Sequence, residues 1–298
     1  MKIVVGLDHF DEARRAVEFV GALKFKNPSA DLLHVIERIG APVWEHFPDE
    51  QLGLINRILK GQEVEARNIL LRGAADFARV QITVKSKIIT GFSAAKHIMA
   101  YADQSEADLI AIGSQAKGRV EGLMVGSVGR KLAIGARQSV LVAKGGSSLD
   151  GPITAVFATD HSEYANRYLE ALLKFAPSGI QRLIVLTAFP KNLIGAMRGV
   201  MENFSIDVST WVEEKLYEHN KSAIEKLRPL GWQFESRVMN APVNDAIKQA
   251  MQEFNAQLLI VGAHGHGFFE RMMLGSIALH QVVAEPHSVL ILREQYQG

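Results

Sequence analysis

The sequence contains no cysteine, so disulfide bonds, thiol catalysis and thiolate metal sites are excluded. It has no excess charge of one sign: 33 lysines and arginines stand against 32 aspartates and glutamates, which argues against binding to nucleic acid or an anionic membrane. No apolar segment approaches the ~20 residues that cross a bilayer, and the apolar run before Asp8 is too short for a signal-peptide core. We therefore expect a soluble cytoplasmic protein that binds neither nucleic acid nor membrane.

The two halves of the chain resemble each other. An apolar segment that ends in Asp-His occurs near the start (IVVGLDH) and again in the middle (ITAVFATDH), each followed by a helical pattern. Further along, Ala107–Lys144 aligns without gaps to Ala256–Arg293. A repeat of about 150 residues indicates a duplicated domain. We expect a first domain at residues 1–144, a glycine- and serine-rich linker at 145–151 and a second domain at 152–298.

Within each half, short segments rich in Val, Ile and Leu alternate with longer segments of helical periodicity. This alternation predicts an α/β fold in which a five-stranded parallel sheet is covered by helices on both faces. The expected strands are 2–7, 30–36, 82–89, 108–113 and 139–144 in the first half and 153–158, 182–188, 232–239, 258–263 and 288–293 in the second. Ligands of such sheets bind beyond the carboxyl ends of the strands, where the strand order reverses.

The stretch GAHGHGFFERMMLGS, residues 262–276, lies at that edge. Gly262 ends a strand, Gly265 lies in the following turn, and Gly275 precedes a helix whose expected N-cap is Ser276. Backbone N–H groups of the turn and of the helix start would form a cradle for an anion, which can approach closely because glycine has no Cβ. Taken alone, the glycines at 262 and 265 are more simply explained by a tight turn, and Gly275-Ser276 by an ordinary helix start.

Other residues at the same edge suit the remainder of a nucleotide. Asp160 ends the first strand of the second half and can accept hydrogen bonds from hydroxyl groups or an exocyclic amine. Val261 and Ala188 end neighbouring strands and would pack against a base. An anion cradle, a hydrogen-bond acceptor and an apolar wall together favour a nucleotide as the ligand.

These motifs make both halves similar to domains of the universal stress protein family, over nearly the whole chain. The nucleotide-binding branch of that family carries Gly-x2-Gly-x9-Gly-(Ser/Thr) after a first strand ending in Ala-x-Asp, and the second half matches both patterns. The resemblance implies two tandem, doubly wound, Rossmann-like domains that bind adenine nucleotides and pack as an internal pseudo-dimer. It implies bound ATP, with Mg²⁺ on the phosphates, hydrolysed slowly or not at all, so no catalytic residue is assigned. The binding residues that it implies are Ala158, Thr159, Asp160, Ala188, Val261, Gly262, Gly265, His266, Gly275, Ser276 and Ile277.

The first half departs from the pattern. Its motif reads Gly113-Ser-Gln-Ala116, so alanine stands where the second glycine belongs. If position 116 requires a positive φ, alanine costs about 1 kcal/mol or more, and its methyl group opposes close approach of a phosphate. We therefore expect ATP to be held mainly by the second domain, with a weaker first-domain site at Asp8, Val35, Gly113, Gly126 and Ser127.

The expected function is that of an ATP sensor in a stress response, which changes its surface or its regulatory protein partner when nucleotide binds. A homodimer beyond the internal pairing is compatible with the sequence. Two alternatives stay open: a scaffold that binds a protein or a small apolar molecule under the dissimilar segments 38–58 and 189–216, and a slow ATP hydrolase. His264 and His266 have no third ligand at suitable spacing, so no metal site is expected there.

Overall fold

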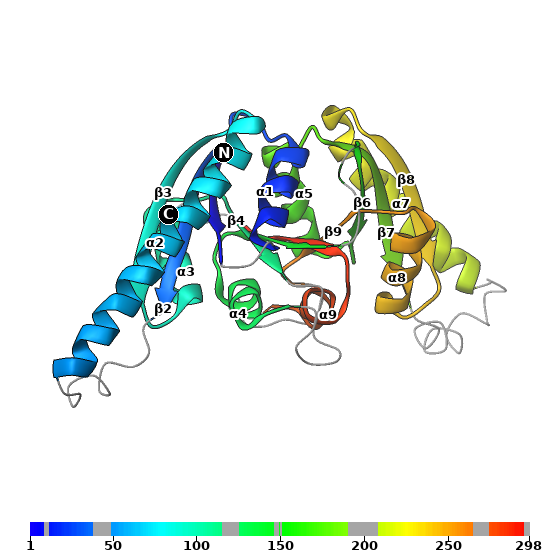
Figure 1. Ribbon diagram of the computed structural model, residues 1–298. Coiled ribbons are helices and arrows are strands. Elements are labelled where there is room, and N and C mark those ends of the chain that lie inside the picture. The colour runs from blue at the N-terminus through cyan, green and yellow to red at the C-terminus, as the bar shows by residue number, and fades with distance from the viewer. Residues whose placement is uncertain are drawn as a thin grey trace.

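The computed structural model describes residues 1–8, 12–37, 49–114, 125–145, 149, 151–189, 208–264 and 274–294 (Figure 1). The first half contains β1 (Lys2–Gly6), α1 (Glu12–Leu23), β2 (Ser29–Glu37), α2 (Asp49–Arg79), β3 (Thr83–Gly91), α3 (Ala94–Gln104), β4 (Leu109–Ser114), α4 (Ser127–Gly135) and β5 (Ser139–Lys144). The second half contains β6 (Ile153–Ala158), α5 (Glu163–Phe175), β7 (Ile180–Ala188), α7 (Val208–Leu227), the 3-10 turn η3 (Arg228–Leu230), β8 (Gln233–Met239), α8 (Val243–Glu253), β9 (Leu258–Gly262), α9 (Ser276–Ala284) and β10 (Ser288–Leu292). All ten expected strands are present, and their ends shift by at most two residues.

The ten strands form one sheet in the order β3-β2-β1-β4-β5-β10-β9-β6-β7-β8. Neighbouring strands are parallel except β5 and β10, which pair antiparallel and join the two halves. The strand order of each half reverses once, between β1 and β4 and between β6 and β9. At the join, Leu141 stands opposite Leu290, its equivalent in the repeat, so a pseudo-twofold axis passes between them. The predicted pair of doubly wound sheets, packed as an internal pseudo-dimer, is confirmed.

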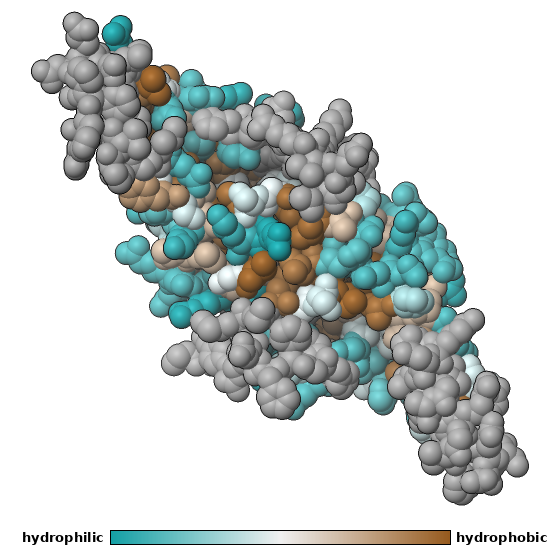
Figure 2. All heavy atoms as spheres, turned by 90° about the horizontal axis from the view of Figure 1, so that it is seen from below, coloured by the Kyte–Doolittle hydropathy of each residue, from teal (hydrophilic) through white to brown (hydrophobic). Residues whose placement is uncertain are grey.

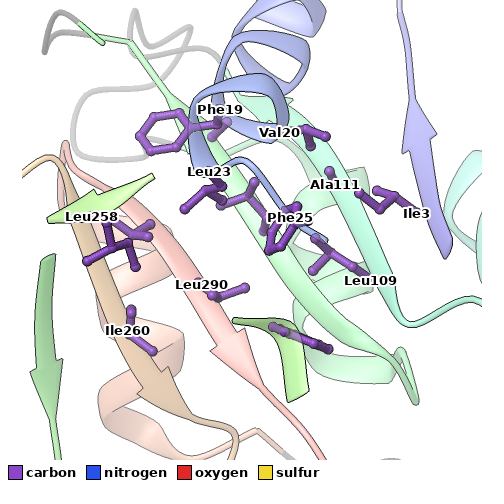
Figure 3. Close-up of a cluster of buried hydrophobic side chains, with 14 of the residues drawn as sticks. Ile3, Phe19, Val20, Leu23, Phe25, Leu109, Ala111, Leu258, Ile260 and Leu290 are labelled. Atoms are coloured by element: carbon purple, nitrogen blue, oxygen red, sulfur yellow. The ribbon is translucent and has the colours of Figure 1, made fainter. Parts of the chain in front are cut away.

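Two hydrophobic cores cover the faces of this sheet. One core is formed with α1, α2, α5 and α7, and the other with α3, α4, α8 and α9. Figure 3 shows the first core, in which Leu23 and Phe25 of the first half gather with Leu258 and Leu290 of the second. The ring of Phe25 also meets that of Phe175 edge-on, with centroids 6.3 Å apart. Packing is therefore continuous across the join.

The face that carries α4 and α9 has apolar residues gathered near its centre, with hydrophilic residues around them (Figure 2). The two helices contact each other, so equivalent helices of the two halves meet beside the pseudo-twofold axis. Ile134 of α4 and both Ile277 and Leu279 of α9 are partly buried against the second core. Within the described part of the chain, no helix is both long and apolar enough to span a membrane.

A buried cation from each half lies at the end of a helix of the other half. Lys144, at the end of β5, donates from Nζ to the carbonyl oxygens of Gln281 (3.0 Å) and Glu285 (2.6 Å) at the end of α9. Arg293, its equivalent after β10, donates to carbonyl oxygens in the last turn of α4. The two cations are 1% and 7% exposed. Both side chains donate to carbonyl oxygens that a helix C-terminus leaves without partners within the helix, so each half caps a helix of the other.

Candidate nucleotide-binding site

A cavity of about 270 Å³ lies where β6 and β9 end side by side, at the reversal of strand order in the second half. The pairing of Ala158 with Val261 brings the two strand ends together. Nine of the eleven residues predicted for the second half line the cavity: Ala158, Thr159, Asp160, Ala188, Val261, Gly262, Gly275, Ser276 and Ile277. The other two, Gly265 and His266, lie outside the described residues. The convergence of the nine described residues on one cavity is observed, whereas the role of all eleven in nucleotide binding stays a prediction.

One side of the cavity is an apolar wall. Leu186 and Ala188 come from β7, and Val243 and Ile247 lie one helical turn apart on α8. Apolar pockets with a few polar groups are typical of small-molecule sites, and this wall suits a flat aromatic ring. The spacing of Val243 and Ile247 is visible in the sequence, but the same spacing occurs on any core-facing helix and does not identify a cavity.

The tip of β6 supplies the carboxylate of the cavity. The N–H of Thr159 donates to the carbonyl oxygen of Leu186 at 3.0 Å, which holds this tip against β7. Asp160 Oδ1 accepts from the N–H of Ser162 at 3.0 Å, just before α5 begins. The two hydrogen bonds fix the carboxylate at the cavity wall, where it can accept from a ligand hydroxyl or amine.

A buried polar network supports this tip from behind. His161 has a φ of 55°, and its Nε2 lies 2.9 Å from both Thr187 Oγ1 and Asn220 Oδ1. Thr187 donates its hydroxyl proton to Asn220 Oδ1 (2.7 Å), so we assign the proton of the neutral imidazole to Nε2. Burial lowers the pKa of His161, which favours the neutral ring. The network ties the tip of β6 to β7 and α7.

The start of α9 forms another side of the cavity. Gly275 is the N-cap, with φ −59° and ψ 148°, and its carbonyl oxygen accepts from the N–H of Leu279 at 2.9 Å. The prediction that Ser276 is the N-cap is therefore wrong, because Ser276 is already the first helical residue. Glycine has no side chain to cap the helix, which leaves the first amides of α9 for water or a ligand. The N–H of Gly275 donates to Ala263 O at 2.7 Å and ties α9 to the end of β9.

Tyr168 of α5 is a cavity residue that the sequence did not indicate. Its ring packs so closely on Gly262 that a Cβ at Gly262 would lie 2.1 Å from Tyr168 Cε2. Gly262 therefore has a packing reason to be glycine, apart from any ligand. The tyrosine oxygen accepts from the N–H of His264 at 3.1 Å and lies 3.2 Å from His264 Nδ1. Burial raises the pKa of Tyr168 to about 12, so the hydroxyl is protonated at neutral pH.

The predicted first-half residues lie at equivalent places in the fold. Val35 is in β2 and Gly113 in β4, on the strands that flank β1, and Asp8 is exposed just beyond β1. Gly126 is the N-cap of α4 and forms no side-chain hydrogen bond there. Ser127 is thus the first residue of α4 and not its N-cap, as Ser276 is the first residue of α9.

Several predicted features lie outside the described residues. They are Ala116 of the first-half motif, residues 146–148 and 150 of the linker, and residues 38–48 and 190–207 of the two dissimilar segments. Within the described ranges, no three His, Asp or Glu side chains are grouped so as to hold a metal ion.

The fold and the cavity together define a doubly wound α/β protein whose candidate site lies at the reversal of strand order in its second half. The model of the Universal stress protein family matches residues 1–144 and 154–293, and the chain belongs to this family.

Similar proteins share the tandem arrangement. The universal stress protein Rv2005c of Mycobacterium tuberculosis is 24% identical over 311 residues, which cover 98% of this chain and 97% of the relative. The crystal structure of a universal stress protein from Archaeoglobus fulgidus matches with a TM-score of 0.66 and 17% identity, over 99% of this chain and 98% of that one. A functionally unknown protein from Pseudomonas aeruginosa matches with a TM-score of 0.59 and 14% identity, over 98% and 92% of the chains. At these identities the two structures show a shared fold.

Proposed function

We propose that this protein binds ATP in the second-half cavity and acts in the cytoplasm as a nucleotide-dependent sensor in a stress response. One observation carries the proposal: an apolar wall, the Asp160 carboxylate and the uncapped start of α9 converge on a single cavity. These groups match the base, the hydroxyl groups and the phosphates of a nucleotide in turn.

Each part of ATP has a suitable side of the cavity. The adenine would pack between Ala188 and Val261, and Asp160 would accept a hydrogen bond from the ribose or from the exocyclic amine. The phosphates would lie against the amides of Ser276 and Ile277, at the positive end of the α9 dipole. The cavity, about 270 Å³, is close to the lower end of the roughly 300–1,000 Å³ of small-molecule sites, which suits a nucleoside with its phosphates at the helix start.

The chemistry of the site supports binding more than turnover. Asp160 is the one carboxylate among the described cavity residues, and its Oδ1 already accepts from Ser162. Phosphoryl transfer requires a positioned water and neutralised charge, and Asp160 is assigned here to the nucleoside and not to the phosphates. A divalent ion such as Mg²⁺ would be carried by the phosphates and would neutralise part of their charge. We propose that the signal is a change of surface, read by a regulatory partner protein.

A pair of equivalent glycine variants tests the proposal. Gly275→Val is expected to abolish measurable ATP binding in calorimetry, because a β-branched side chain would fill the space that a phosphate approaches. The added Cβ would also lie 3.3 Å from Ala263 O, so thermal unfolding is measured on the same samples. Gly126→Val is the matched control at the start of α4, where a Cβ meets no heavy atom of the described residues within 4 Å, and it is expected to leave ATP binding at the second-half site unchanged. Unchanged ATP affinity in folded Gly275→Val protein would contradict the proposal.

A further inference from the structure

His264, the second residue beyond β9, is hydrogen-bonded to α5 through the side chain of Tyr168. Tyr168, which is 2% exposed, reaches from α5 past Gly262 to the first residues beyond β9. Its hydroxyl contacts two atoms of a single residue, the backbone N–H and the ring Nδ1 of His264. Both Tyr168 and His264 line the cavity, so this attachment is part of its wall.

The protons of this contact can be assigned. The backbone N–H of His264 donates to the tyrosine oxygen, so the hydroxyl proton must find an acceptor of its own, because an unsatisfied buried O–H is costly. Among the described residues, the acceptor within hydrogen-bond distance is His264 Nδ1, at 3.2 Å. We assign Tyr168 as the donor to Nδ1, which places the proton of the neutral imidazole on the buried Nε2.

The same short segment is tied a second time, to the helix start. The carbonyl oxygen of Ala263 accepts from the N–H of Gly275 at 2.7 Å, while the next residue, His264, is held by Tyr168. The two arms of the proposed phosphate cradle, the loop after β9 and the start of α9, are thus fixed relative to each other at Ala263 and His264. Groups that bind a ligand through backbone amides depend on such pre-organisation.

The first half has no equivalent of this tyrosine. Arg15 aligns with Arg167 in the repeat, which places Ala16 at the position of Tyr168. A methyl group cannot reach the residue after the strand end, and Ala16 is buried in the core of its own half. The difference between the halves is separate from the replacement of glycine by Ala116.

We propose that Tyr168 is a positioning residue for nucleotide binding, which holds the backbone and the ring of His264 and so sets the start of the phosphate-side loop. This inference rests on the proposed function, because it assigns a role within that site. It makes Ala16 a second cause, besides Ala116, of weak nucleotide binding by the first half.

The test compares two tyrosines of α5. Tyr168→Phe removes the hydroxyl and keeps the ring that packs on Gly262, so ATP affinity is expected to fall about five- to twentyfold, with the melting temperature lowered only slightly. Tyr164→Phe is the matched control: its ring lies 6.2 Å from that of His264, and ATP affinity is expected to stay within about twofold.

Nitrogen-15 NMR of histidine-labelled protein without nucleotide tests the contact itself, at pH 8, with His264→Gln used to assign the signal. Wild-type protein is expected to show an unprotonated, hydrogen-bonded Nδ1 in His264, whose resonance shifts in Tyr168→Phe and not in Tyr164→Phe. A protonated Nδ1 in the wild type, or unchanged ATP affinity in folded Tyr168→Phe, would overturn the inference and leave the proposed function standing. Failure of the wild type to bind ATP would overturn the proposed function, and the role of Tyr168 with it.

Discussion

At Gly262, close packing and ligand binding would both require a residue without a Cβ. The glycine motif predicted the close approach of an anion, and the structure shows that the ring of Tyr168 occupies the place of a Cβ at Gly262. A motif of spaced glycines therefore indicates a crowded strand end without showing which group lies against it. Tyr168 escaped prediction because a tyrosine on an amphipathic helix fits any core position, and its contact with Gly262 joins residues remote in the chain.

Gly262→Ala is expected to lower the free energy of unfolding by about 1–3 kcal/mol, because the new methyl group would overlap the buried Tyr168 ring. Urea unfolding of the single variant, of Tyr168→Ala and of the double variant measures this coupling. The cost of Gly262→Ala should largely disappear when Tyr168 is alanine. An equal cost in both backgrounds would show that the ring is not the cause.

At the scale of the element, α9 was placed correctly by its sequence but its first residue was not. Glycine and serine both occur at N-caps, and the dihedral angles of Gly275, which decide between them, depend on its hydrogen bond to the end of β9. The strands were easier to predict, because runs of β-branched residues between turns depend little on remote contacts. Cavity residues such as Val243 could not be told from core residues, since both face inward.

Ser276→Pro removes the backbone N–H of the first residue of α9 while keeping the helix. Proline is favoured at the first helical position, and Gly275 already has the extended ψ that a following proline requires, so α9 is expected to remain intact. The variant lacks one N–H of the proposed phosphate cradle, and ATP affinity should fall about tenfold or more. Ser127→Pro makes the same change at the start of α4 and should leave the ATP affinity of the second-half site unaltered. Equal ATP affinity of Ser276→Pro and wild type in calorimetry would argue against phosphate binding at α9.

At the scale of the whole molecule, the two halves depend on each other through Lys144 and Arg293. The repeat aligned these two residues, but only the antiparallel pairing of β5 with β10 shows that each reaches a helix of the opposite half. The sequence could predict two domains and, through the family resemblance, their pairing. It could not predict that Lys144 and Arg293 each reach a helix of the opposite half, because the register of the join depends on the packing of both halves.

The buried lysine makes stability depend on pH. Burial lowers the pKa of Lys144 to about 7, whereas an unfolded lysine titrates near 10.5. Between these values the unfolded chain binds more protons than the folded one, so stability is expected to rise with pH, by up to about 1.4 kcal/mol per unit. Lys144→Met should remove this increment in urea unfolding at pH 7 and pH 9, whereas Lys174→Met, which changes an exposed lysine, should keep it. The same slope in Lys144→Met and wild type would contradict the assignment.

We propose that a single half of this tandem protein, the second, holds the nucleotide tightly. Calorimetric titration of the nucleotide-stripped, full-length protein with ATP and Mg²⁺ tests it most directly, because stoichiometry and affinity come from one curve. We expect one site per chain, lost in Gly275→Val and kept in Gly126→Val. Two equivalent sites per chain, or no binding to the wild-type protein, would contradict it.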